Sequence, residues 1–363
     1  MIRLIKPYVN FEEVRNEFEE VFESGWFTKG KFVDEFRNLL KSYTGSKNAF
    51  LTTSATTALT MSLKILDIKA GDEVIISDFS FPATANVVED LGAIPIFADV
   101  SLETFNMLPD ELENKITTKT KAVIFVDALG NPSGILKIKA ICEKYNLPLI
   151  EDGACAIGSS ENTIKCGNIA DLTCFSFHPR KLLTTGEGGA ITTNNEEYAK
   201  LLEIKLNHGS VVNDGKFDFI DYGYNYRMSE LQAVMGIKQL EKLDSIVKSR
   251  NTIRDMFIVQ LEQLGFKEQK VTKDVVYNVQ SLVFQVPSEI NRDDLVSYLK
   301  NNKIETTIGT YSLSATTYYK NKYNNIQKNS SNLEKNTITL PCYENLEINK
   351  IYKIISGYIS NVK

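Results

Sequence analysis

The residues best suited to do chemistry lie in one segment, where a short apolar strand leads to a lysine and then to a glycine-rich turn. This segment, residues 174–190, reads Cys-Phe-Ser-Phe-His-Pro-Arg-Lys-Leu-Leu-Thr-Thr-Gly-Glu-Gly-Gly-Ala, and its lysine is Lys181. An amine attacks a carbonyl in its neutral form, and burial at a fixed position lowers its pKa enough to supply that form. Lys181 is therefore a candidate for forming a Schiff base. The alternative is a surface lysine on a loop, since lysines are mostly exposed.

Further candidate residues follow predicted strands. Asp152 ends the apolar run 147–151, where a carboxylate can pair with a cationic ligand or cap a helix. The segment 54–56, Ser-Ala-Thr, opens a predicted helix directly after a strand, where free N–H groups and the helix dipole favour an anion such as a phosphate. Ser176 offers a hydroxyl at the end of another strand. For both segments the alternative is ordinary Ser/Thr capping, which uses the same atoms for the helix itself.

Together these motifs resemble the DegT/DnrJ/EryC1/StrS family of pyridoxal-phosphate-dependent sugar aminotransferases. The lysine segment is similar to the family's cofactor-lysine signature, and residues 151–154 match its Glu-Asp-x-Ala pattern. Residues 54–59 are similar to its Ser-Gly-Thr-Ala-Ala-Leu pattern, with Ala55 in place of glycine. The resemblance runs from Gly25 to Pro341 and implies a fold-type-I transferase. It also implies pyridoxal 5'-phosphate as the cofactor, with pyridoxamine 5'-phosphate as the intermediate form.

The resemblance implies a role for each cofactor residue. Lys181 forms the Schiff base and moves the proton, and Asp152 pairs with the pyridine nitrogen. Phe81, in Asp-Phe-Ser-Phe-Pro at residues 78–82, stacks on the cofactor ring; its alternative is a core position. The residues expected at the cofactor phosphate are Ala55, Thr56 and Ser176.

A second motif, Gly-Tyr-Asn-Tyr-Arg-Met at residues 223–228, resembles the family's Gly-Tyr-Asn-x-Arg-Met signature. In the family this asparagine reaches the cofactor phosphate of the neighbouring subunit, which implies that Asn225 does so here and that the protein is a homodimer with shared active sites. Arg227 is suited to bidentate binding of the amino donor's carboxylate, with a surface ion pair as the alternative. The further expected substrate contacts are Trp26, Phe27, Thr28 and Tyr311.

Two positions depart from the family pattern. The third residue after Asp152 is commonly Gln or His in the family and contacts the phenolic oxygen of the cofactor. Here it is Cys155, and a thiol is a weak hydrogen-bond partner. The segment 310–319 lacks the histidine of the family's Tyr-x-x-Leu-His pattern. Because that segment faces the sugar nucleotide in the family, the identity of the substrate stays open.

The elements expected to position these residues alternate along the chain. Apolar strands are expected at residues 48–53, 73–77, 94–98, 122–126, 147–151 and 172–176, with helices such as 57–66 and 83–91 between them. Apolar strands bounded by helices indicate an α/β fold with a mostly parallel sheet covered on both faces, and the resemblance implies seven strands. Ligands bind at the carboxyl ends of such strands, where the candidate residues fall.

The pattern changes after about residue 229, which indicates a second, smaller α+β domain. We expect a long helix over 229–249, a strand over 282–286, helices over 292–301 and 350–359, and a polar loop over 310–335. The predicted domains are residues 1–240, which hold the cofactor, and residues 241–363.

Composition argues against several other functional classes. The formal charge of -5 comes from 41 basic and 46 acidic residues that are well mixed, which argues against nucleic acid as a partner. No apolar run reaches the roughly 18 to 20 residues of a membrane helix, and the N-terminus has no signal-peptide pattern, so we expect no membrane association and a cytoplasmic protein. Two histidines, and five cysteines without a CxxC pair, predict no metal site.

The resulting expectation is a pyridoxal-phosphate-dependent aminotransferase. It would transfer an amino group from an amino acid, with L-glutamate as the expected donor, to a keto-sugar linked to a nucleoside diphosphate. One alternative is a family member that acts on a small keto-cyclitol or a phosphorylated ketone. Another is a cofactor-binding regulator without turnover, which intact Lys181 and Asp152 disfavour. A family dehydratase is disfavoured because those members carry histidine in place of the Schiff-base lysine.

Overall fold

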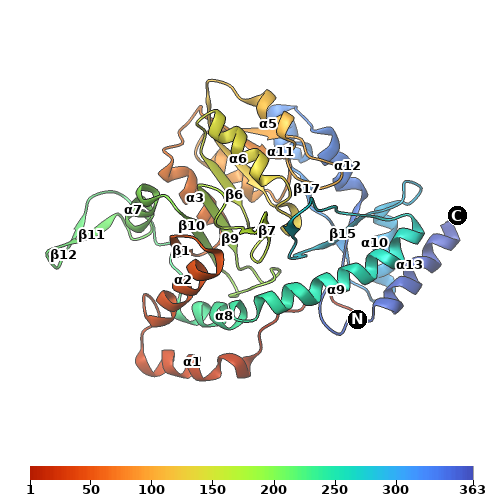
Figure 1. Ribbon diagram of the computed structural model, residues 1–363, viewed down its shortest axis with the longest axis horizontal. Helices are drawn as coiled ribbons and strands as arrows, with labels where there is room; N and C mark the ends of the chain where they lie inside the picture. The colour runs from red at the N-terminus through yellow and green to blue at the C-terminus, as the bar shows by residue number, and fades with distance from the viewer. Residues whose placement is uncertain (363) are drawn as a thin grey trace.

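A seven-stranded sheet forms the centre of the computed structural model, which describes residues 1–362 (Figure 1). Its strands lie in the order β1-β10-β9-β6-β5-β2-β4, and of the seven only β10 runs antiparallel to its neighbours. The strands are β1 Asn48–Thr52, β2 Glu73–Ser77, β4 Ile94–Ala98, β5 Thr120–Val126, β6 Leu149–Asp152, β9 Leu172–Ser176 and β10 Gly189–Thr193. The predicted α/β fold with a mostly parallel seven-stranded sheet is confirmed.

Helices cover both faces of this sheet. Successive side chains of a strand point to opposite faces, so Val74 and Ile76 enter one apolar cluster and Ile75 enters another. The first face is covered by α3 Ala55–Ile65, α4 Ala83–Asp90 and α7 Glu196–Lys205. The second is covered by α1 Phe11–Ser24, α2 Lys31–Thr44, α5 Pro109–Lys115, α6 Ile135–Lys144 and α8 Glu230–Leu240. Burial on both faces explains why these strands are apolar along their length.

A second apolar core lies in the C-terminal part of the chain, coloured cyan to blue in Figure 1. It joins a four-stranded sheet, in the order β13-β15-β18-β16, to three helices. These elements are α9 Leu243–Leu261, β13 Lys267–Glu268, β15 Leu282–Gln285, α10 Arg292–Asn301, β16 Thr307–Ile308, β18 Thr337–Leu340 and α13 Ile348–Val362. Ile2 pairs with Ile304 and packs against the same core. The predicted boundary between residues 240 and 241 falls between α8 and α9 and stays a prediction.

Short elements complete the fold. They are β3 Phe79–Ser80, η1 Ala128–Gly130, β7 Ser160–Glu161, β8 Ile164–Lys165, β11 Ser210–Asn213, β12 Lys216–Phe219, η2 Glu262–Leu264, β14 Val275–Val276, β17 Tyr311–Ser312, η3 Leu313–Ala315, α11 Thr317–Tyr323 and α12 Lys328–Asn336. The β11–β12 hairpin projects from the body of the molecule (Figure 1). β17 pairs with β3, which brings the C-terminal part of the chain to the end of β2.

Two predictions of secondary structure are wrong. The helix expected over 229–249 is two helices, α8 and α9, with a break at residues 241–242. The polar loop expected over 310–335 contains β17, η3, α11 and α12. Tertiary contacts explain the second difference, because Tyr319 of α11 packs its ring against Phe97 of β4 and Leu333 of α12 is fully buried. Anchors of this kind stabilise helices whose remaining residues are polar.

Candidate active site

A cavity of about 210 Å³ lies at the carboxyl edge of the central sheet. Four of the predicted cofactor residues line it: Phe81, Asp152, Cys155 and Lys181. Asp152 ends β6 and Cys155 follows it, while Phe81 follows β3 and Lys181 follows β9. Parallel strands bring their carboxyl ends to one edge. Residues of the C-terminal core, among them Gln280 and Leu340, close the cavity from the other side.

The loop that carries Lys181 is held from both parts of the chain. Lys181 N–H donates to the carbonyl of His178 at 2.8 Å. Gln280 accepts from Leu182 N–H at 2.6 Å and donates to the carbonyl of Arg180 at 2.8 Å, so it holds the residues on each side of the lysine. The Lys181 ammonium donates to Cys155 Sγ at 3.0 Å. The two residues predicted from separate motifs therefore lie in contact.

Asp152 ends β6 with its carboxylate buried at the cavity wall. Oδ2 accepts a hydrogen bond from Thr84 Oγ1 at 2.7 Å, and Oδ1 accepts one from Ala154 N–H at 3.3 Å. Burial raises the pKa of the Asp152 carboxyl, while these two hydrogen bonds and the Lys181 charge act to lower it. In the described chain the residues after Asp152 form turns that lead to β7, so no helix starts there that its side chain could cap.

The predicted phosphate site is formed by the first turn of α3. Ser54 caps this helix through Thr57 N–H at 3.1 Å, so the N–H groups of Ala55 and Thr56 remain free among residues 1–362. Gly189 of β10 allows the turn to approach, because a Cβ there would lie 2.4 Å from the carbonyl carbon of Ser54. Ser176 is paired with Gly189 in the sheet, so its hydroxyl lies at the same edge. The alternative reading of Ser54 as a helix cap is correct for that residue and leaves the other donors available for an anion.

Phe81 lines the cavity and contacts Tyr311, which is not among the lining residues. Their ring centroids are 6.2 Å apart in an edge-on arrangement. Phe81 is 65% exposed, which contradicts the alternative of a core position. The buried carboxylate of Asp78 holds the segment after Tyr311, since it accepts from Ser314 N–H at 2.7 Å and from Ser312 Oγ at 2.9 Å.

The other predicted residues do not line this cavity. Asn225 is exposed, and Arg227 lines a separate cavity. Trp26 and Phe27 are exposed, and Thr28 pairs with Ser229 in a short bridge. The contact of Asn225 with a partner's cofactor phosphate and the substrate contacts of the other four residues therefore stay predictions.

The buried carboxylate of Glu230 fixes the position of this second group of residues, which lies in the segments 26–30 and 225–230. Glu230 is 1% exposed, and its N–H donates to the carbonyl of Phe27 at 2.9 Å. Its side chain accepts from three backbone N–H groups at the start of α2, those of Gly30 at 2.8 Å, Phe32 at 2.9 Å and Val33 at 3.2 Å. The segments 26–30 and 225–230 are thus tied together, although they lie far apart in the sequence.

Lys29 belongs to this group and was not predicted. Lys29 Nζ donates to Asn207 Oδ1 at 2.5 Å, and Arg227 Nη1 lies 3.5 Å from the same oxygen. Burial, and then the Arg227 charge, lowers the pKa of Lys29. Arg227 Nε is buried and has no partner in the described chain. Two cationic groups therefore converge on one neutral oxygen, an arrangement that an anion would stabilise.

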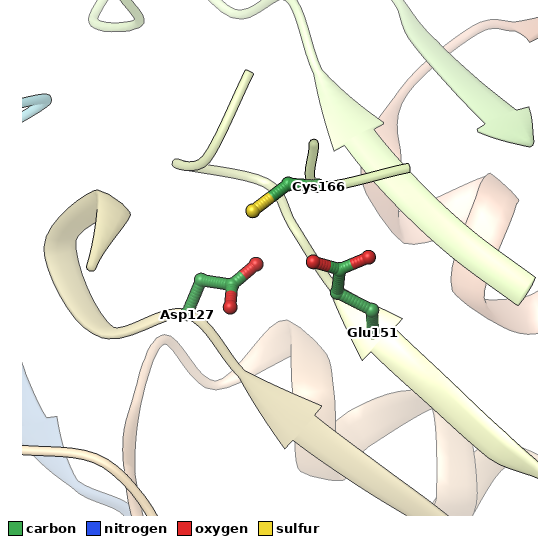
Figure 2. Close-up of side chains that lie close together, drawn as sticks. All are labelled: Asp127, Glu151 and Cys166. Carbon is green, nitrogen blue, oxygen red and sulfur yellow. The ribbon is translucent and has the colours of Figure 1, made fainter. Parts of the chain in front are cut away.

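Three buried groups, of which Asp127 lines the cavity, were also not predicted to meet. Asp127, Glu151 and Cys166 lie with their carboxylate oxygens and sulfur within 4.8 Å of one another (Figure 2). Asp127 follows β5, Glu151 lies in β6, and Cys166 follows β8. The expectation of no metal site took account of residue counts and of spacing along the sequence, so it could not anticipate a cluster that forms only in the fold.

A model of the DegT/DnrJ/EryC1/StrS aminotransferase family matches residues 10–358. The chain belongs to this family. The GDP-perosamine synthase of Vibrio cholerae is 33% identical over 311 residues, which cover 84% of each chain. The 3-oxo-glucose-6-phosphate:glutamate aminotransferase of Bacillus subtilis is 30% identical over 361 residues, which cover 97% of this chain and 80% of that protein. The structure of Spr1654 from Streptococcus pneumoniae, solved in its PMP form, matches over the whole of both chains with a TM-score of 0.94 and 27% identity.

These findings confirm the predicted family, the fold-type-I class and the prediction of a pyridoxal-phosphate-dependent aminotransferase. The PMP form of Spr1654 contains the amine form of the predicted cofactor. None of the helices in residues 1–362 combines the length and the apolar character that a membrane span requires. The cytoplasmic location and the dimer stay predictions.

Proposed function

We propose that the protein transfers an amino group from L-glutamate to a keto-sugar linked to a nucleoside diphosphate, with pyridoxal phosphate as the cofactor. One observation carries the proposal: a lysine amine and a buried carboxylate, Lys181 and Asp152, face one cavity at the carboxyl edge of the sheet. When bound, the cofactor withdraws electrons from the amino-acid carbanion and carries the amino group between donor and acceptor. The residues present fit this group, since the first turn of α3 leaves two N–H donors free for its phosphate.

Each side chain then has a specific task. Lys181 would hold the carbonyl carbon of the cofactor covalently and, once released, would carry the proton at the α-carbon of the donor. Asp152 would keep the pyridine nitrogen protonated, with its orientation fixed by Thr84. Phe81 would lie against the ring, and Cys155 would contact the phenolic oxygen. The proposed phosphate contacts are Ala55, Thr56 and Ser176.

Two observations support an anionic substrate. Lys29 and Arg227 converge on one neutral oxygen in a cavity that Asp34 and Glu203 also line. Glu203 is already paired with Arg37 at 3.1 Å. A diphosphate, a phosphate or the carboxylate of the donor each fits this pair. The names of two relatives cover both substrate classes, a GDP-sugar synthase and an aminotransferase of a sugar 6-phosphate. A phosphorylated ketone is therefore the second candidate substrate, in place of the nucleotide sugar.

A substrate panel tests this proposal. Glutamate is expected to bleach the visible band of the bound cofactor, because the amino group moves onto it. Among acceptors, a nucleoside-diphosphate keto-sugar is expected to exceed a keto-sugar 6-phosphate in kcat/KM by at least about tenfold, the effect of roughly 1.4 kcal/mol of added binding. The reverse order would establish the phosphorylated ketone as the substrate. A band that no amino donor changes would instead identify a regulator.

Mixed dimers test whether the active site is shared. A Lys181→Ala protomer combined with an Asn225→Asp protomer gives one site with both lesions and one with neither, if Asn225 serves the partner. Equal mixing makes about half of the dimers mixed, each with one intact site, so about a quarter of the wild-type activity is expected to return.

As a control, each variant undergoes subunit exchange with itself, and no activity is expected to return. Absence of any regain, with subunit exchange demonstrated by a mass-tagged protomer, would show that Asn225 acts in its own chain.

A further inference from the structure

The cluster of Asp127, Glu151 and Cys166 lies beside Asp152 and has no place in the proposed reaction. Asp127 and Glu151 are 0% exposed, and Cys166 is 1% exposed. In Figure 2 the two carboxyl groups face each other, with the sulfur of Cys166 directed toward the same space. The two acids come from adjacent strands, because Val126 of β5 pairs with Asp152 of β6.

The hydrogen bonds of the two acids differ. Glu151 Oε2 accepts from Thr173 Oγ1 at 2.5 Å and from Gly167 N–H at 3.1 Å. Glu151 Oε1 and both oxygens of Asp127 receive no donor from residues 1–362. Two ionised carboxylates in contact, with three oxygens unsatisfied and no water-exposed surface, would be strongly destabilising. A proton on Asp127 removes one charge and supplies the missing donor to Glu151.

We propose that Asp127 and Glu151 share one proton, with Asp127 neutral and donating to Glu151, and that Asp127 in this form is a positioning residue for Asp152. Glu151 takes the negative charge because it already accepts two hydrogen bonds. The thiol of Cys166 is available as a further donor to it. The charges of Glu151, Asp152 and Cys155 act on Asp127, and the sulfur of Cys166 lies within 4.8 Å of its carboxylate.

The electrostatics agree with this assignment. Burial, and then the Glu151 charge, raises the pKa of the Asp127 carboxyl well above its ordinary value. Burial, more than the charge of a neighbouring carboxylate, raises the pKa of the Cys166 thiol, which keeps it protonated. Bound zinc would require all three groups in their ionised forms. A shared proton satisfies Glu151 Oε1 and one oxygen of Asp127 without that cost.

The consequence for catalysis rests on the proposed function of Asp152. Asp127 N–H donates to the carbonyl of Asp152 at 3.3 Å, so the two strand ends are joined. A neutral Asp127 places no second negative charge beside the carboxylate of Asp152, which is proposed to face the cofactor nitrogen. The hydrogen bond from Asp127 to Glu151 also fixes the end of β5. Asp127 also lines the cavity, but its proposed effect on the cofactor passes through Asp152.

Infrared difference spectra of the holoenzyme test the shared proton. The difference spectrum of wild type minus Asp127→Asn is expected to show the carbonyl stretch of one protonated carboxylic acid at pH 8. This band is expected to shift in D₂O. Asp78→Asn is the matched control, since burial raises the pKa of Asp78 to about 6. Its difference band is expected at pH 5 and is lost by pH 8, because Asp78 ionises between them. No acid band for Asp127 at pH 8, or one zinc ion per chain in the purified protein, would overturn the proposal.

Two substitutions test the positioning role. Asp127→Asn keeps a donor to Glu151, so the pH midpoint of the cofactor's visible band and kcat are expected to stay within about twofold of wild type. Asp127→Leu keeps a branched side chain but has no donor, so a shifted midpoint and at least about a tenfold lower kcat are expected, equal to a lost hydrogen bond of about 1.4 kcal/mol.

Equal behaviour of the two variants would overturn the positioning role. If the leucine variant does not fold, a shifted pH midpoint of the cofactor's visible band in Asp127→Asn would by itself overturn the positioning role. The infrared band requires neither catalysis nor a substrate, so its result is separate from a failure of the proposed function.

Discussion

Replacing Lys181 with alanine is expected to leave a folded protein that binds the cofactor without a covalent bond and is almost inactive. The substitution removes the nucleophile and the proton carrier together, and loss of a positioned general base alone typically costs about 10² to 10⁴-fold. Single-turnover kinetics with glutamate measure the effect on the first half-reaction. The loop should persist, because Gln280 holds it through backbone groups of the neighbouring residues.

Lys144→Ala is the matched control for this substitution. Lys144 is 62% exposed and pairs with Glu113 at 2.5 Å on the surface, so its removal should leave turnover unchanged. Turnover of Lys181→Ala within roughly tenfold of wild type, well short of the general-base loss, would contradict the assigned role.

Replacing Asp152 with asparagine is expected to remove most transamination while cofactor and fold persist. Asparagine can still accept the hydrogen bond from Thr84, but it carries no charge to keep the pyridine nitrogen protonated. A loss of about 10²-fold or more in kcat is expected, the scale for removing one charge-stabilising group. Wild-type turnover in this variant would show that Asp152 has a structural role only, although no helix starts there for it to cap in the described chain.

The sequence was sufficient to predict the central sheet because its strands are clear apolar runs. Residues 73–77 and 94–98 are apolar runs bounded by helices, and both are strands with the predicted bounds. The segment 310–335 could not be predicted in the same way. Its helices α11 and α12 are mostly polar and depend on a few buried anchors, such as Tyr319 and Leu333, which local propensity does not reveal.

The candidate site was predictable only where a motif keeps its residues close in the sequence. Lys181 and Cys155 are 26 positions apart, and their contact follows from the order of β6 and β9 in the sheet. Thr84 and Lys29 carry no local signal, since their roles arise from partners elsewhere in the chain. The cluster of Asp127, Glu151 and Cys166 is hidden for the same reason, because an acid at a strand end gives no sign of what its side chain will face.

Borohydride reduction of the holoenzyme, followed by peptide mass analysis, tests the central claim most directly. Reduction makes the bond between a lysine and the cofactor carbonyl permanent, so the cofactor mass is expected on the peptide that contains Lys181. Lys205 is an informative comparison, because it is 7% exposed but already paired with Asp221 at 2.7 Å. Cofactor mass on Lys181 alone is the predicted result. Cofactor mass on Lys205 or any other lysine, with the Lys181 peptide unmodified, would contradict the account.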